Sequence, residues 1–82
     1  MDFEIHKCKG KAALTVNPRK KIKIDLLKKE KKFDCLVKTR VMLIIKHKSM
    51  IINIYENGKL RIPILDMEKA KKIAEEIYKV IL

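Results

Sequence analysis

Two histidines and two cysteines are the side chains of this sequence best suited to bind a metal ion: His6, Cys8, Cys35 and His47. Imidazole and thiolate are the ligands of structural zinc sites, which take them in close pairs across tight turns. His6 and Cys8 form one such pair and would share a face of a strand, whereas Cys35 and His47 stand alone. We therefore expect no metal and no cofactor, with a zinc site between strands as the alternative.

Carboxylates that could serve as a general acid and base are scattered along the chain. The only adjacent pair is Glu75 and Glu76, and neighbours on a helix point about 100° apart. A cysteine–histidine nucleophile would lack a third group to orient it. Two glycines, Gly10 and Gly58, are too few for a phosphate-binding loop. The sequence thus predicts a non-catalytic protein.

The strongest compositional signal is positive charge. Lys and Arg number 21 against 10 Asp and Glu, which gives a net charge of +11. A protein of this charge attracts polyanions and meets nucleic acid in a salt-dependent manner. The abundance of Lys and Ile and the absence of Gln are also typical of thermophiles, so total charge alone does not decide. The placement of the cations is more informative.

The 82 residues and their 48% hydrophobic content predict one domain, residues 1–82, with one core. The longest apolar runs, residues 41–45 and 50–52, are far below the roughly 20 residues of a membrane span. The first four residues do not resemble the start of a signal peptide, and two cysteines cannot build a disulfide framework. We therefore expect a cytoplasmic protein without membrane contact.

The clearest element is an amphipathic helix towards the C-terminal end. Asp66 can cap it, and Glu68 stands in its first turn. Apolar residues recur at i, i+3, i+4, i+7 and i+11, namely Ala70, Ile73, Ala74, Ile77 and Ile81. This stripe predicts a helix that covers a core with one face and meets solvent with the other.

Two strands before this helix flank residues 56–58, and the length of the turn decides their register. A two-residue turn at Asn57 and Gly58 would mix apolar and charged side chains on both faces. A three-residue loop, with Gly58 in the left-handed conformation, pairs Ile54 with Leu60 and leaves one face wholly apolar. We therefore predict the three-residue loop.

Residues 36–47 alternate like one long strand that feeds this hairpin through Lys48 and Ser49. The predicted fold is α+β, an antiparallel meander with one face covered by the C-terminal helix. The opposite face would carry cations interleaved with polar and apolar side chains: Lys38, Arg40, Lys46, Lys59, Arg61, Asn53, Tyr55, Met42, Ile44 and Ile51. A merely solvated face does not need apolar side chains among its cations, so this face is the candidate binding surface.

The first third of the chain permits two interpretations. Residues 3–8 and 12–16 alternate like short strands, and Pro18 would end the second. Residues 22–26 then suggest a further strand, whereas residues 25–30 suggest a short helix. Periodicity does not separate these two over so few residues.

The order of segments over residues 33–82 resembles one repeat of the TATA-box-binding protein. The matching segments are FDCLV at residues 33–37, INIYENGKL at residues 52–60 and EKAKKIAEEI at residues 68–77. Members of that family have an F-x-x-L/V-V segment, a strand and turn ending in S-G-K, and a helix of the E-E-A-x-x-A-x-x-K-I type.

The resemblance implies a saddle-shaped antiparallel sheet, with helices on its convex side and nucleic acid on its concave side. In the family, two aromatic side chains of each repeat insert between base pairs of the minor groove, and by position these are Phe33 and Tyr55. The saddle needs two repeats, so a symmetric dimer or another partner would supply the second half.

Two functions are therefore expected of the open face. The leading hypothesis is weak binding of DNA or RNA, in which the five cations contact phosphates while Tyr55 and Asn53 touch bases or sugars. The alternative is a module that dimerises or docks on another protein through the apolar side chains Met42, Ile44 and Ile51. A homodimer closed over this face would hide it from nucleic acid.

Overall fold

A computed structural model of the chain describes residues 2–10 and 12–82. Within these residues the strands are β1 (Phe3–Lys7), β2 (Leu14–Pro18), β3 (Asp34–Lys38), β4 (Met42–His47), β5 (Met50–Tyr55) and β6 (Leu60–Ile62). The helical elements are α1 (Leu26–Lys29), the short 3-10 turn η1 (Glu30–Lys32) and α2 (Met67–Ile81).

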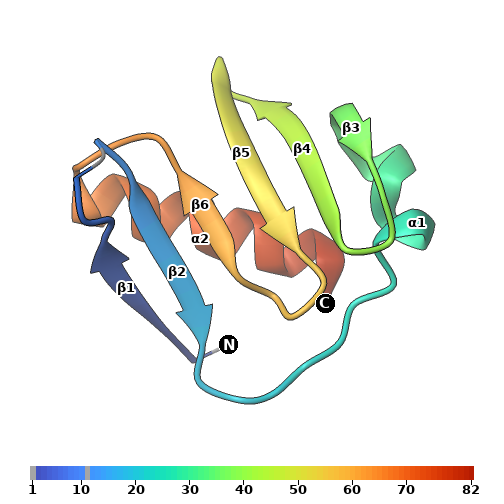
Figure 1. Cartoon of the computed structure of the whole chain (residues 1–82), viewed down its shortest axis with the longest axis horizontal. Coiled ribbons are helices and arrows are strands. Elements are labelled where there is room, and N and C mark those ends of the chain that lie inside the picture. Colours follow the sequence, from blue (N-terminus) through green and yellow to red (C-terminus); the bar gives the residue numbers. More distant parts are fainter. Residues whose placement is uncertain (1, 11) are drawn as a thin grey trace.

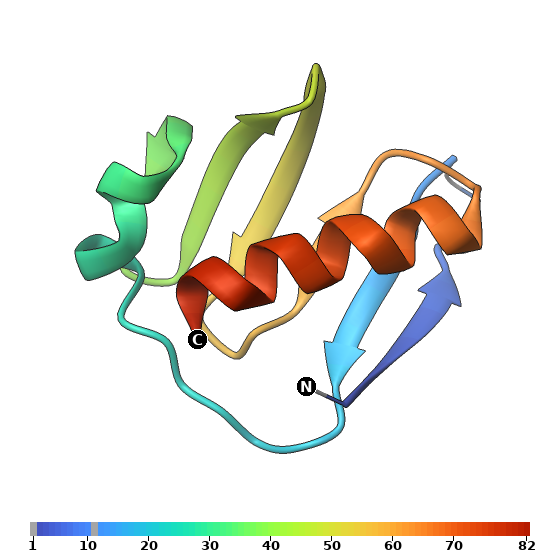
Figure 2. The ribbon, with the colours of Figure 1, turned by 180° about the vertical axis from the view of Figure 1, so that it is seen from behind.

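The strands form one antiparallel sheet in the order β1-β2-β6-β5-β4-β3. A hairpin, β1–β2, joins a four-stranded meander, β3–β6, because β2 pairs with β6. Figure 1 shows the sheet in front of α2, and Figure 2 shows α2 crossing the other face of the sheet. The predicted α+β fold, with one sheet face covered by the C-terminal helix, is confirmed.

The core lies between the sheet and α2, as the helix pattern predicts. The stripe residues Ala70, Ile73, Ala74, Ile77 and Ile81 are all buried, and they pack with the inward side chains of the strands. Each large apolar side chain buried here contributes about 1.5–3 kcal/mol relative to an exposed one. No helix of the described residues is long and apolar enough to cross a membrane.

The N-terminus of α2 is capped as expected. The Asp66 side chain accepts a hydrogen bond of 3.2 Å from the Lys69 amide. This bond satisfies one of the backbone amides that a helix leaves free in its first turn. The helix therefore begins where the sequence predicts.

The turn between β5 and β6 follows the predicted three-residue register. Ile54 pairs with Leu60, and the Tyr55 amide donates to the Lys59 carbonyl at 2.9 Å. Gly58 has a φ of +88°, and the Asn57 side chain accepts a hydrogen bond from the Lys59 amide. This register places the side chains of Ile54 and Leu60 in the core and those of the adjacent residues on the other face.

The prediction of one strand over residues 36–47 is wrong, because the chain turns back at residues 39–41 and forms β3 and β4. The Thr39 hydroxyl donates to the Met42 carbonyl and accepts from the Met42 amide, both at 2.9 Å. Together with the hydrogen bond of 3.0 Å from the Thr39 amide to the Met42 carbonyl, these local bonds close the turn. The alternation of residue types continues through the turn, so periodicity does not reveal the turn. Val41, an apolar residue of this alternation, is exposed.

The first third of the chain forms the predicted hairpin, and its ambiguous part is helical. Leu26 is buried at the start of α1, and η1 follows directly. Residues 19–25 have no regular structure and run along the ends of the strands (Figure 1). The Ile24 amide donates to the Glu56 carbonyl at 2.7 Å, which ties this segment to the β5–β6 turn.

Candidate nucleic-acid interface

The sheet face opposite α2, here called the open face, carries one row of side chains that crosses all six strands. Directly paired residues share a face of a sheet. Successive pairings define the row as His6, Thr15, Arg61, Asn53, Ile44 and Val37. Met42 and Tyr55 pair on one side of this row, and Lys46 and Ile51 pair on the other.

Three of the predicted cations belong to the open face: Lys46, Lys59 and Arg61. None of them forms an ion pair with a carboxylate of the described residues. The Lys59 Nζ lies 5.7 Å from the centre of the Tyr55 ring, so the aromatic side chain is next to a cation. The nearest acidic group in the register is Asp34, which stands opposite Lys46 on β3. Positive charge therefore remains unneutralised at the centre of this face.

A shallow hollow of about 270 Å³ lies on the open face. It is lined by Arg61 and Asn53, with Ile51 and Pro63 beside them. A guanidinium and an amide at an apolar hollow offer several hydrogen-bond donors and a surface for a sugar or a base. This is the part of the face best shaped for a small portion of a ligand.

The structure does not bring Lys38 and Arg40 onto the open face. Lys38 pairs with Leu43, whose side chain is buried in the core, so Lys38 stands at the edge on the helix side. Arg40 lies in the β3–β4 turn, where it borders a hollow together with Lys23 and Glu56. Arg40 leaves the open face because it lies in the turn, whereas Lys38 leaves it because the register shift between Cys35 and Val37 reverses the face to which the following side chains of β3 point.

Phe33 also fails to reach the open face. It is half-buried and packs against the core, on the same side as Cys35. The resemblance implies that Phe33 is a second inserting aromatic side chain on the open face, and this placement is wrong. Tyr55 is on the open face, since it pairs with Met42 across β4 and β5.

The apolar residues predicted for this face, Met42, Ile44 and Ile51, are all there, and Val37 joins them. Ile51 is 55% exposed and Val37 41% exposed. The sequence pattern assigns Val37 to the core, on the same face as Ile45, because an uninterrupted alternation takes no account of the register shift between Cys35 and Val37. A bulge of this kind turns the following side chains to the other face.

A basic segment, residues 19–23, follows β2 and lies beside the β5–β6 turn. Lys20, Lys21 and Lys23 are exposed along the strand ends, where Lys20 and Lys21 line a hollow of about 400 Å³ with Asn17 and Asn57. Arg19 in this segment is already paired, at 3.5 Å, with the carboxylates of both Asp2 and Glu4. The run Arg19-Lys20-Lys21 is visible in the sequence, but its place beside Asn57 depends on the fold.

The four candidate metal ligands are separated by the sheet. Cys8 follows β1, and its Sγ lies 2.8 Å from the Thr15 hydroxyl, whereas Cys35 is on β3 at the opposite edge. The Cys35 thiol donates to the Glu30 carbonyl at 3.2 Å, and burial raises the pKa of this thiol. Among residues 2–10 and 12–82, no group of three or more His, Cys, Asp or Glu side chains is placed to hold a metal ion.

The β4–β5 turn is attached to α2 on the other side of the sheet. Lys48 donates to the Glu76 carboxylate at 2.7 Å, and this bond lowers the pKa of Glu76 below its ordinary value. His47 Nε2 lies 3.4 Å from the second carboxylate oxygen but makes no hydrogen bond to it. Lys48 is therefore engaged away from the open face, although Lys46 two residues earlier is not.

Comparison with known proteins gives no match to a family model, to a curated protein or to a solved structure.

Proposed function

We propose that this chain is a small, non-catalytic binding module that holds DNA or RNA weakly against its open face. The observation that carries the proposal is the placement of Lys46, Lys59 and Arg61 on the uncovered face, where none of them forms an ion pair with a carboxylate of the described residues. Unpaired cations at a sheet surface attract phosphates and lose little when they exchange water for them.

Each group of the face has a distinct part in this binding. Arg61 offers a planar fork that binds a phosphate through two hydrogen bonds, and Lys46 and Lys59 act as point charges. Tyr55 offers a stacking surface for a base or sugar, and Asn53 offers donors and an acceptor beside Arg61. Phosphate contacts dominate, so the binding is weak and tolerant of sequence.

The likeness to one repeat of the TATA-box-binding protein stays part of this proposal. It is supported by an antiparallel sheet with the C-terminal helix on one face and Tyr55 on the other. Because Phe33 packs in the core, we do not extend the proposal to insertion of two aromatic side chains. We also place the protein in the cytoplasm of a thermophile, in line with its two free thiols and its Lys-rich composition.

The direct test is fluorescence anisotropy of labelled duplex DNA, single-stranded DNA and RNA at two salt concentrations. We expect micromolar binding that weakens steeply with salt, and the strongest of the three ligands identifies the polymer. A chain of net charge +11 that binds none of them at low salt would contradict the proposal.

A second candidate function uses the same face to dock on a protein. The observation in its favour is the exposure of Ile51 and Val37, which are 55% and 41% exposed beside Ile44. Contiguous exposed apolar side chains are typical of protein interfaces. The substitution Ile51→Lys distinguishes the two functions, because an added positive charge strengthens nucleic-acid binding, whereas the loss of the apolar side chain weakens docking on a protein.

A further inference from the structure

The two edges of the sheet differ in how accessible they are to another strand. At the β3 edge, the register shifts between Cys35 and Val37, and η1 lies alongside, held by the hydrogen bond from Cys35 to Glu30. A bulge and a neighbouring element both hinder the addition of a strand. At the other edge, β1 pairs with β2 over five consecutive residues without any shift. No other strand of the described residues pairs with its outer side.

The outward backbone groups of β1 can be identified from its bonds to β2. The Cys8 amide donates to the Ala13 carbonyl, so residue 8 faces β2. Amide and carbonyl of one strand residue point to the same side, and the side alternates along the strand. The backbone groups of Phe3, Ile5 and Lys7 therefore point away from the sheet.

We propose that β1 pairs antiparallel with β1 of a second copy of this chain, with Ile5 of both copies at the twofold axis. Across this junction only outward-facing residues exchange hydrogen bonds, so an odd-numbered residue must meet an odd-numbered one. The register centred on Ile5 pairs Ile5 with its own copy and Phe3 with Lys7 of the partner subunit. It uses all outward-facing residues of β1, whereas a register shifted by two residues leaves one of them unpaired.

The polar side chains of Glu4 and His6 are complementary in this register, as hydrogen-bond acceptor and donor. Glu4 stands opposite His6 of the partner subunit, and the twofold axis repeats the pair. Within one chain, Glu4 Oε2 lies 3.0 Å from His6 Nε2. The junction thus gathers two carboxylates and two imidazoles in alternation. On the helix side the two half-buried Ile5 side chains meet next to Val16, which extends the core from one subunit into the other.

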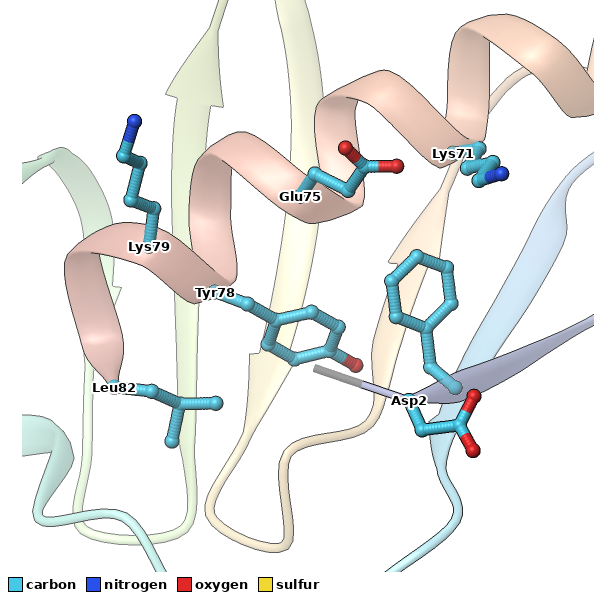
Figure 3. A pocket seen from close by; sticks show the side chains of 7 residues that line it. Asp2, Lys71, Glu75, Tyr78, Lys79 and Leu82 are labelled. Atoms are coloured by element: carbon cyan, nitrogen blue, oxygen red, sulfur yellow. The ribbon is translucent and has the colours of Figure 1, made fainter.

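A hollow on the helix side borders the proposed junction. It has a volume of about 780 Å³ and lies between the start of β1 and the C-terminal half of α2, beside Phe3 and Tyr78 (Figure 3). The rings of Phe3 and Tyr78 are 5.5 Å apart, and the hollow is lined by two carboxylates, Asp2 and Glu75, and by two ammonium groups, Lys71 and Lys79. In this register the partner subunit's Lys7 stands opposite Phe3 at the rim of the hollow, and the pairing does not depend on its side chain.

Pairing through β1 leaves the open face accessible. The twofold axis of an antiparallel strand pair is perpendicular to the sheet, so both open faces lie on the same side of a continuous sheet. This arrangement differs from a dimer closed over Ile44 and Ile51, which would bury the face. The test of this dimer is independent of nucleic-acid binding, because it measures the molar mass of the protein in the absence of any ligand.

The test is sedimentation equilibrium of the full chain and two variants at rising protein concentration. Lys7→Pro removes an outward amide and places a ring where the partner strand would lie, yet it removes no bond to β2. Lys7→Ala removes the side chain alone and is the matched control. Circular dichroism verifies that both variants keep the fold.

We expect the wild-type chain and Lys7→Ala to approach about twice the chain mass of 9.7 kDa, and Lys7→Pro to stay at the chain mass. A wild-type chain that remains monomeric, or a dimer that Lys7→Pro leaves intact, would overturn the proposal. If Lys7→Pro does not fold, amide exchange of the wild-type chain decides. The Ile5 amide must then become protected at high protein concentration, and an unprotected amide refutes the pairing.

Discussion

The Tyr78 hydroxyl donates a hydrogen bond of 2.6 Å to the Gly58 carbonyl, joining α2 to the turn between β5 and β6. The Tyr78 ring is buried, and burial raises the pKa of its hydroxyl, so the group stays a neutral donor. Gly58 precedes Lys59, whose ammonium group lies near Tyr55 on the open face. One buried bond on the helix side therefore holds the turn that presents part of the binding surface.

Replacing Tyr78 by Phe removes this hydroxyl and leaves a buried carbonyl without its donor. We expect Tyr78→Phe to lower the free energy of unfolding by about 1–2 kcal/mol, measured by urea denaturation. The slope of the transition should not change, because the variant exposes the same surface on unfolding. A midpoint equal to that of the wild-type chain would show that the bond does not stabilise the turn.

Gly58 is required by conformation and by space. Its φ is +88°, and a Cβ there would lie 2.5 Å from Ile22 Cδ1 and 2.7 Å from Pro18 Cγ. Gly10 has a similar φ of +72°, but a Cβ there meets no described atom within 4 Å. Gly10→Ala thus measures the conformational cost alone and is the matched control.

We expect Gly58→Ala to destabilise the chain by about 2–4 kcal/mol and Gly10→Ala by about 1 kcal/mol. Thermal unfolding followed by circular dichroism compares the two. Equal losses would mean that the contacts of Gly58 with Pro18 and Ile22 relax without cost.

The stability of the fold should depend on the charge of Glu76. Its pKa is lowered in the folded chain, chiefly by the hydrogen bond from Lys48. A lowered folded pKa adds stability above the ordinary pKa of a glutamate, about 4.3, and this stability is lost as the pH falls through the folded pKa. Glu76→Gln should therefore be less stable than the wild-type chain at pH 7 and approach it in acid.

Unfolding of both proteins across this pH range measures the difference, which is small because the carboxylate is largely exposed. A difference that is the same at pH 7 and at pH 3 would exclude a contribution from the carboxylate charge.

The parts of the fold that the sequence predicts are those decided by strictly local patterns. The α2 stripe with its Asp66 cap follows from the helical period, and the loop at Gly58 follows from the need for one apolar face. The sequence pattern does not reveal the turn at Thr39, because hydrogen bonds between Thr39 and Met42 close it while the alternation of residue types continues. The turn removes Arg40 from the face on which a continuous strand would have placed it, and the register shift between Cys35 and Val37 removes Lys38.

The residues of the candidate site are predictable from the sequence only where they lie on regular strands. Asn53, Tyr55 and Arg61 lie on well-defined strands, and their shared face follows from the register. The position of Val37 depends on a bulge, which leaves no mark in a sequence read for period two. The position of the basic segment, residues 19–23, beside the β5–β6 turn depends on contacts between residues distant in sequence, such as the hydrogen bond from Ile24 to Glu56.

A charge introduced at Ile51 distinguishes nucleic-acid binding from protein docking. Ile51 is exposed on the open face, opposite Lys46, so Ile51→Lys should fold normally. If the face binds nucleic acid, one added cation strengthens binding by roughly three- to tenfold at low salt. If it docks on a protein, the loss of apolar surface abolishes that contact and leaves nucleic-acid binding unchanged. Anisotropy titrations of the two chains measure the effect.

The most direct measurement is the salt dependence of nucleic-acid binding for two triple variants of equal charge. One combines Lys46→Ala, Lys59→Ala and Arg61→Ala on the open face. The other combines Lys69→Ala, Lys71→Ala and Lys72→Ala on the exposed side of α2. Affinity falls as salt rises, and we predict that the first variant makes the slope of log affinity against log salt less steep by about 2–3. The second variant should leave this slope nearly unchanged. Equal losses from the two variants would contradict binding through the open face.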